Sequence, residues 1–431
     1  MHFTHITFSY DSWRKCLLGV SFFSVFGLLF WQGGRLPITD LLILLTVVTA
    51  FSNAEARAAI WSLFFKRQDP DIRWVAWPYL IWFLANILSW AVSASEFSNF
   101  PHWTLRFPLA LCILALASQE RFVSRYLLVG ICVAAVSAAG QAAWDLYLDK
   151  SRATGLMNKS IDFGNWCALL GMLLIMAAAL ASHVRAGWRL GLLLLSILPL
   201  GASLVSATRG SLLALPVLAL ILIFLRKDRF HRCIVVLGVA FMLLAGALFF
   251  TSSTMHEHLR LSEAKQDIAE ASEKNYATSI GARFVMWQAA LEMFKKNPVL
   301  GVGPGVFEQE LAGLLETNVL PPIQKVFGHA HSDILHTLAT NGAIGVAAYF
   351  LLLIGQLRFF GRSLAISSKV GNANQRVYAA AGILVVGAWF CFGLTDSNVV
   401  KKIHSSAFPL LVCALATQLK SISPPTKQCV N

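Results

Sequence analysis

The sequence has few charged residues, and this scarcity separates it from ordinary soluble proteins. Only 13% of its 431 residues are charged, whereas 57% are hydrophobic. A soluble domain of this length carries roughly a quarter charged residues. The apolar residues recur in runs close to the ~20 residues that a helix needs to cross a bilayer, and these runs lack the alternation of barrel strands. The composition therefore predicts an all-α integral membrane protein.

Several common metal- and nucleotide-binding patterns are also missing. The eight cysteines are scattered, none lies in 252–330, and no CxxC pair occurs, so neither a disulfide framework nor a cysteine metal site is available. The turn-rich segment 301–305 is not followed by the Gly-Lys-Ser/Thr of a phosphate loop. No basic groove with interleaved aromatic residues indicates nucleic acid. The net charge of +13 is therefore attributed to cytoplasmic loops and their contact with anionic lipid.

The apolar runs predict about twelve membrane-spanning helices. The segment 55–73 is too short and too charged to span, and we expect it to lie at the membrane surface. The first run is expected to be an anchor and not a cleaved signal peptide. The predicted spans are 16–33, 37–54, 74–92, 104–119, 126–147, 160–182, 188–206, 210–225, 233–251, 333–357, 377–394 and 403–419.

Positive charge gathers on alternate connections between these runs, which predicts their orientation. Cytoplasmic loops carry an excess of Lys and Arg, so both termini are expected in the cytoplasm. The basic connections contain Arg57, Lys66, Arg67 and Arg73, then Arg121 and Arg125, then Arg185 and Arg189, then Arg226, Lys227, Arg229 and Arg232, and finally Arg358, Arg362, Lys369 and Arg376. The expected location is the inner membrane of a bacterial cell.

One long polar segment interrupts the apolar pattern and faces the opposite side of the membrane. Long loops are usually functional or carry elements of their own. We therefore expect three parts: nine transmembrane helices in 1–251, a large periplasmic loop in 252–332, and the last three helices with a cytoplasmic tail in 333–431. Within the loop, 283–296 is expected to form an amphipathic helix whose apolar stripe contains Phe284, Trp287, Leu291 and Phe294.

The loop ends in a cluster of three histidines, His329, His331 and His336. A metal site would need further ligands with suitable spacing, and no HExxH is present, so no metal is expected. A structural, hydrogen-bonded role stays open for each histidine. A catalytic base is the alternative, because imidazole titrates near neutrality and accepts a hydroxyl proton.

Arginines near the outer rim supply the complementary charge. An arginine between two apolar spans, such as Arg209, is costly and is usually functional or paired, although it can also extend to the head groups. Arg283 begins the loop helix, where a bound anion would offset the unfavourable helix dipole, as solvent also could. Arg152 has either a similar or a structural role. Asp396 either orients an arginine or the histidine, or it pairs with a lysine such as Lys401 or Lys402.

Taken in order, four local motifs resemble the O-antigen ligase family, within the group of O-antigen ligases, polymerases and bacterial O-oligosaccharyltransferases. The resemblance covers essentially the whole chain, including the topology. The motifs are Arg152-Ala153-Thr154-Gly155, Ala207-Thr208-Arg209-Gly210-Ser211, Gly281-Ala282-Arg283, and His329-Ala330-His331-Ser332-Asp333 followed by Asn341-Gly342-Ala343-Ile344-Gly345. Relatives often have Asn after the histidine, where this chain has Ser332, so no role is assigned to that position.

The resemblance implies a GT-C-like, metal-independent and inverting glycosyltransferase without a cofactor. Its donor would be a glycan on undecaprenyl diphosphate, and its acceptor would be lipid A-core sugar at the periplasmic face. His331 matches the proposed catalytic histidine, whereas Arg209 and Arg283, with Arg152, match or accompany the arginines thought to bind the diphosphate. We expect His329 and Asp396 to support them. Membrane lipids are the other expected partners.

Three other functions remain open from the sequence. An O-antigen polymerase would use the same donor with a second lipid-linked glycan as acceptor. A protein O-oligosaccharyltransferase is a further alternative, although the tail after 419 is short for the extra domain of such enzymes. A secondary transporter or lipid flippase would belong to a different class. It would have inverted repeats and ionisable residues at mid-membrane depth, and neither is evident.

Overall fold

The described part of the chain consists of helices and the turns and loops that connect them. The structure is a computed structural model that describes residues 10–27, 29–31, 37–65, 71–93, 96–117, 123–181, 184–224, 267, 270, 276 and 278–419. No strand occurs within these ranges. An all-α fold was expected, because a membrane-embedded backbone must satisfy its hydrogen bonds within each helix.

Twelve of the α-helices in the described ranges form the body of the bundle, and two further helices cover one end of it. The first six are α1 (Tyr10–Gly27), α2 (Pro37–Ser52), α3 (Ala54–Phe65), α4 (Arg73–Val92), α5 (Arg106–Leu116) and α6 (Val123–Tyr147). The next three are α7 (Ser160–Leu180), α8 (Ala186–Val205) and α9 (Arg209–Phe224). The last three are α15 (Asp333–Val370), α16 (Ala373–Gly393) and α17 (Lys402–Thr417), and the two covering helices are α13 (Ser279–Lys296) and α14 (Phe307–Glu316).

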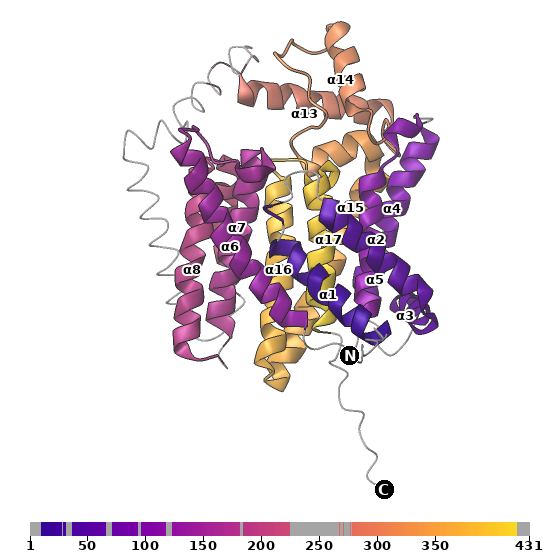
Figure 1. Cartoon of the computed structure of the whole chain (residues 1–431). Helices are drawn as coiled ribbons and strands as arrows, with labels where there is room; N and C mark the ends of the chain where they lie inside the picture. Colours follow the sequence, from indigo (N-terminus) through magenta and orange to yellow (C-terminus); the bar gives the residue numbers. More distant parts are fainter. Residues whose placement is uncertain are drawn as a thin grey trace, which may run out of the picture.

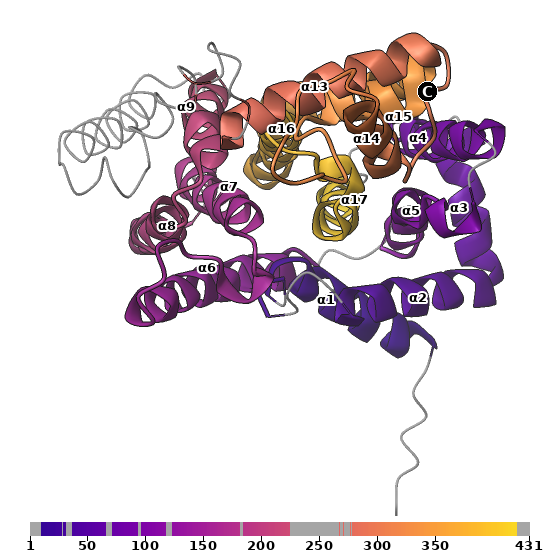
Figure 2. The same cartoon turned by 90° about the horizontal axis from the view of Figure 1, so that it is seen from above.

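The bundle has two different ends. Helices α13 and α14 lie across one end, which we call the capped end (Figure 1). The α7–α8 and α15–α16 connections lie at the opposite end (Figure 1). Helix α17 runs through the middle of the bundle, surrounded by other helices (Figure 2). Every residue of α17 from Ile403 to Thr417 is buried, so this helix has no solvent-facing side along that length.

Six described helices are long and apolar enough to cross a membrane, judged by length and composition: α4, α6, α7, α8, α15 and α16. The bent pair of α2 and α3, which meet at 101°, raises the number to seven if it counts as one span. Helices α5, α9 and α17 are apolar but shorter. The predicted count of twelve spans is therefore not confirmed, and the predicted ninth span, 233–251, lies outside the described residues.

Helix α15 is longer than predicted and is broken near its start. It extends to Val370, whereas its apolar stretch was expected to end at residue 357. Gly342 has φ 62° and ψ −159°, a backbone conformation that only glycine adopts readily. Val302 N and Gly303 N donate to carbonyls of α15 just before this break, and Ala343 N donates back to the carbonyl of Pro298. The turn-rich segment 301–305 therefore contacts the opened backbone of α15.

The amphipathic stripe predicted for the loop helix is wrong in its phase. Phe284 and Leu291 are exposed in α13. The buried face consists of Gly281, Ala282, Val285, Met286, Ala289, Ala290 and Met293. These mostly small residues let α13 lie close to α15 and to α14, with a small apolar core between them. The prediction followed the large apolar residues, whereas close helix contact selected the small ones.

Candidate functional site

Four chain segments from separate parts of the sequence meet at the capped end of the bundle. They are the α8–α9 turn with Arg209, the start of α13 with Arg283, the segment before α15 with His331, and the α16–α17 connection with Asp396. Gly210 lies so close to Thr395 that a Cβ on this glycine would approach Thr395 Oγ1 to 2.4 Å. The Arg209 turn and the Asp396 connection are therefore immediate neighbours.

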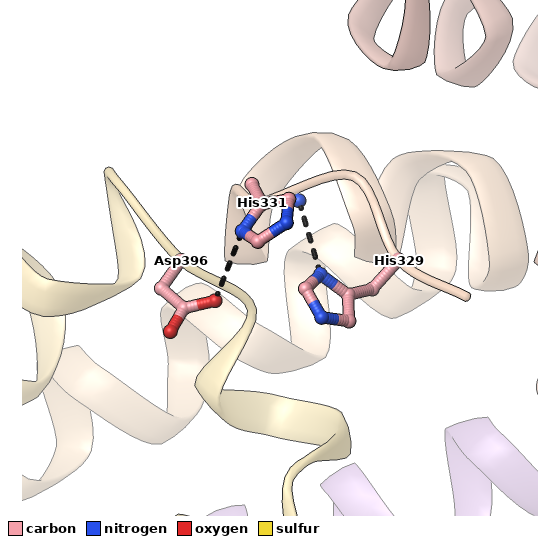
Figure 3. A group of neighbouring side chains, drawn as sticks. All are labelled: His329, His331 and Asp396. Carbon is pink, nitrogen blue, oxygen red and sulfur yellow. Dashed lines mark hydrogen bonds and ion pairs between the residues drawn. The ribbon is translucent and has the colours of Figure 1, made fainter. Parts of the chain in front are cut away.

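His331 and Asp396 form the pair at the centre of this site. His331 Nδ1 lies 3.3 Å from Asp396 Oδ1, although it lacks the alignment of a hydrogen bond (Figure 3). The Asp396 side chain is fully buried, whereas the His331 side chain is 14% exposed. With a carboxylate beside Nδ1, the other ring nitrogen is left to accept a proton. The arrangement suits a general base that a buried carboxylate orients and supports electrostatically.

The backbone around His331 is held in a strained conformation. His331 has φ 51°, in the left-handed region that non-glycine residues rarely adopt. Trp287 of α13 donates its indole N–H to the carbonyl of Ala330 at 3.0 Å. On the other side, Ser332 N donates to Ser397 Oγ at 3.2 Å. These two contacts fix the histidine between α13 and the α16–α17 connection, and such strain persists where neighbouring structure maintains it.

Asp333 joins the histidine segment to the segment that carries Asp396. Its Oδ1 accepts a hydrogen bond from Val399 N at 3.0 Å, and its Oδ2 accepts one from the Tyr349 hydroxyl at 3.2 Å. Gly393 lies directly against the same carboxyl group. From the sequence, Asp333 had no role beyond its place in the histidine motif, but the residue is fully buried. It therefore positions both members of the His331–Asp396 pair.

A chain of buried charges continues inward from Asp396. Lys401 Nζ contacts Asp396 Oδ2 closely and lies 2.7 Å from Asp162 Oδ1 of α7. Asp162 Oδ1 is also 3.0 Å from His404 Nε2 in α17. Of the partners considered for Asp396, the histidine and a lysine are therefore both present at once. Buried charges require such pairing, because an isolated one would be strongly destabilising.

These charges fix the ionisation of Asp396. Burial alone would raise the pKa of Asp396, but Lys401 and the His331 ring outweigh it, and the pKa lies well below its usual range. Burial would likewise lower the pKa of Lys401, but the carboxylates of Asp396 and Asp162 raise it. Asp396 is thus a carboxylate and Lys401 an ammonium at neutral pH.

Arg209 begins helix α9, and Arg283 is the fifth residue of helix α13, which starts four residues earlier than predicted. Burial lowers the pKa of Arg283, the carboxylate of Asp396 raises it, and the charge of Arg209 lowers it further. The three side chains are thus near enough for their charges to act on one another. A helix N-terminus already favours anions, so two of them with two guanidinium groups form a strongly anion-attracting region.

Arg152 contacts the backbone of the α8–α9 turn. Its Nε donates to the carbonyl of Ser206 at 3.0 Å, and one of its terminal nitrogens lies 3.3 Å from the carbonyl of Ala207. Ala207 has φ 49°, so this turn is also in the left-handed region. Arg152 therefore supports the turn that presents Arg209, and a contact with substrate stays a prediction.

His329 lies beside His331 and faces it across 4.2 Å between ring centroids (Figure 3). Burial, followed by the charge of His331, lowers the pKa of His329 to about 3. Possible ligand atoms of His329, His331 and Asp396 all lie within 4.8 Å of one another, which fits three ligands of a metal ion. The Lys401 ammonium on the same Asp396 carboxylate opposes a cation there.

The sequence alone indicated no role for Asp162 or Asp333. It also did not predict that Lys401 contacts the carboxylates of both Asp162 and Asp396. Asp162 and Lys401 are far apart in sequence, so no local spacing joins them. One signal was available. Asp162 and His404 both fall inside apolar runs, where ionisable side chains are costly and need partners.

Comparison with known proteins supports one family. Residues 194–350 match the family model described as O-antigen ligase. This range includes Arg209, Arg283, His329 and His331, whereas Arg152 and Asp396 lie outside it. An uncharacterized protein of Haemophilus influenzae is 28% identical over 189 residues. That similarity covers 44% of this chain and 46% of the relative, so the chain matches about half the length of that protein.

Proposed function

We propose, from the match of residues 194–350 to the family model described as O-antigen ligase, that the chain is an inner-membrane glycosyltransferase. It joins O-antigen polysaccharide from undecaprenyl diphosphate to lipid A-core oligosaccharide at the periplasmic face. The observation that carries the proposal is the pair of His331 and buried Asp396, beside two arginines whose charges reach one another. This combination meets the two needs of glycosyl transfer from a lipid diphosphate, a base and cations.

In this proposal His331 is the general base. Its free ring nitrogen takes the proton of an acceptor hydroxyl, and Asp396 stabilises the imidazolium that forms. The acceptor oxygen forms a bond to the anomeric carbon of the donor as the bond from that carbon to the diphosphate oxygen breaks. A single displacement of this kind inverts the anomeric configuration.

Arg209 and Arg283 stabilise the negative charge that develops on the departing undecaprenyl diphosphate. Arginine suits this role because it stays charged and its forked donors match phosphate oxygens. Fixed cations at a partly dry site contribute about 3–4 kcal/mol each to a developing anion, by analogy with oxyanion-hole donors. Both arginines reinforce the positive ends of helices α9 and α13, and no metal is needed to neutralise the diphosphate.

A lipopolysaccharide gel of a deletion strain tests the proposal. The strain should lose its O-antigen ladder while keeping the lipid A-core, and the wild-type gene should restore the ladder. His331→Ala should not restore it, although it is produced at the same level, whereas Lys295→Ala on the exposed surface of α13 should. A band of core with a single repeat in the deletion strain would instead assign the chain as a polymerase.

Transfer by the purified enzyme tests the chemistry separately. His331→Ala should lower kcat/KM by about 10²–10⁴-fold, as expected for a lost general base. Arg283→Gln should lower it by about 10²–10³-fold, as for a lost oxyanion donor. A chelator should leave the wild-type rate unchanged. Inhibition by the chelator that added divalent metal reverses would overturn the metal-independent mechanism.

A further inference from the structure

A cavity of about 380 Å³ lies at the capped end, next to the His331–Asp396 pair. Its size falls within the range of small-molecule sites. Lys159, Gly305 and Gly328 are exposed and line the cavity, so it opens to solvent at this rim. Neither Arg209 nor Arg283 is among its lining residues. The cavity is therefore formed by residues other than the two arginines.

The cavity reaches the reacting pair through two of its lining residues. His329 lines it, and the His329 ring lies 4.2 Å from that of His331. Lys401 also lines it, and its ammonium group contacts Asp396. A molecule in the cavity would thus end beside the general base, at a wall to which neither arginine contributes.

An unsatisfied polar group lies in the cavity wall. His336 is 2% exposed, and its Nδ1 is buried without a hydrogen-bond partner among the described residues. A buried polar nitrogen without a partner is destabilising, so such a group usually indicates a missing ligand or water. A hydroxyl group of a bound saccharide would satisfy it.

The remaining wall favours a sugar that carries negative charge. Lys159, Lys401 and Lys402 line the cavity, with Asp162 as the acidic residue among its lining residues. Lys401 and Lys402 are held by carboxylates, whereas no ion pair of Lys159 occurs within the described residues. Half-buried Trp103 contributes an aromatic ring, whose flat apolar face with a polar edge suits a sugar ring.

We propose that this cavity is the acceptor subsite and that it binds a saccharide with an anionic substituent such as phosphate. The inference rests on the proposed transferase function. The acceptor hydroxyl enters from the cavity and gives its proton to His331, and its oxygen bonds to the anomeric carbon. The bond from this carbon to the diphosphate breaks on the arginine side, as an in-line displacement requires.

Binding of a phosphorylated core oligosaccharide, freed of lipid, to the donor-free protein in nanodiscs tests the cavity directly. Lys159→Gln should weaken binding about fivefold, as for the loss of an exposed ion pair. Because Lys159 is exposed, this variant should fold, and Lys295→Gln serves as the matched control. Removing the phosphate should weaken binding to the wild type but hardly change binding to Lys159→Gln. Equal weakening of both proteins would overturn the proposal, as would binding of anionic lipid in place of the oligosaccharide.

Transfer kinetics separate this inference from the function on which it rests. Lys159→Gln and Trp103→Ala should raise KM for the acceptor while leaving KM for the lipid-linked donor unchanged. If both variants transfer glycan with an unchanged acceptor KM, the cavity is not the acceptor subsite, and the proposed function is retained. If the oligosaccharide binds in a way that depends on Lys159 but no glycan is transferred to it, the proposed function is refuted and the proposed binding site is retained.

Discussion

Lys401 holds Asp396 in its ionised form. Asp396 is fully buried, and burial by itself favours the neutral acid. Its carboxylate is stable because the Lys401 ammonium lies against one oxygen while the His331 ring faces the other. Lys401 is in turn held by Asp162, so its position does not depend on solvent. Lys401 thus acts on His331 through Asp396, as a positioning residue.

Removing the lysine should therefore change the pH dependence of transfer. In Lys401→Met, burial dominates and the pKa of Asp396 rises, so the carboxylate becomes protonated at a higher pH. We expect the acid limb of the kcat profile to move upward, with a larger loss of activity at pH 5 than at pH 8. Lys150→Met, which removes the partner of another buried carboxylate, Asp145, is the control and should keep the wild-type limb. A uniform loss at all pH values would indicate a purely structural role.

His329 should make the folded protein sensitive to acid. Burial lowers its pKa to about 3, whereas an unfolded histidine titrates near ~6.5. Between these values the unfolded chain binds a proton that the folded chain does not, so stability falls as the pH falls below about 6.5. In detergent, the Tm of the wild type should drop more between pH 7 and pH 5 than that of His329→Gln. Equal drops would mean that the pKa of His329 is not lowered in the folded protein.

Single residues were partly predictable from the sequence. His331, Arg209 and Arg283 stood out because imidazole and guanidinium groups at a membrane rim need a reason to be there. The structure brings all three to the same end of the bundle, next to Asp396. The partner of Asp396 could not be chosen beforehand, because Lys401 and His331 contact different oxygens of one carboxylate. Their roles in catalysis stay predictions.

Among the elements, the break in α15 connects the helix to the segment that precedes α14. Ser89 of α4 donates to the carbonyls of Leu300 and Thr340, so a third element holds the same junction. Gly301 has φ 70°, and a Cβ there would lie 2.3 Å from the Thr340 carbonyl carbon. The break therefore lets a polar loop satisfy backbone groups that a continuous helix would have used itself.

Gly342→Ala should destabilise the protein strongly. The substituted residue would keep a backbone conformation that favours glycine, and its Cβ would lie 2.4 Å from the Val299 carbonyl. Strain and overpacking together should cost about 2–4 kcal/mol, seen as a lower Tm in detergent. Gly361→Ala on the same helix is the control, because nothing lies within 4 Å of its added Cβ. A helix interior should tolerate or favour that change, by up to about 1 kcal/mol.

Hydropathy predicted where most of the described helices begin, but it did not predict which of their faces contact one another. The starts of α2, α4, α7, α8, α9, α15 and α17 lie within two residues of the predicted spans, because the apolar runs and their polar interruptions determine them. The buried face of α13 was mispredicted, because it depends on which residues α15 and α14 present to it. The break at Gly342 also depends on the separate segment that crosses it.

At the scale of the whole molecule, the site and two described basic connections lie at opposite ends of the bundle (Figure 1). The α7–α8 connection with Arg185, and the end of α15 with Lys369, lie away from α13 and α14 (Figure 1). Positive charge near short connections marks the cytoplasmic side of membrane proteins. The geometry is therefore consistent with a site that faces the periplasm, which the proposed acceptor requires.

Labelling of single introduced cysteines should test this orientation. Lys325 and Lys369 are both exposed. Lys325 follows α14 in a segment that packs against the core of α13, and Lys369 lies in the last turn of α15. A membrane-impermeant maleimide should label Lys325→Cys in cells whose outer membrane is permeabilised, and should label Lys369→Cys only after lysis. The unsubstituted chain, with its native cysteines, gives the background.

The opposite labelling pattern would reverse the topology and would also exclude the proposed acceptor. His331, Arg209 and Arg283 would then face the cytoplasm, and lipid A-core displayed on the periplasmic leaflet could not reach them. The same three side chains would still form a base beside an anion-attracting region, because their arrangement depends only on the helices that hold them. Orientation is thus the property that links this local chemistry to ligation, and reversed labelling would remove ligation while leaving glycosyl transfer to a cytoplasmic acceptor.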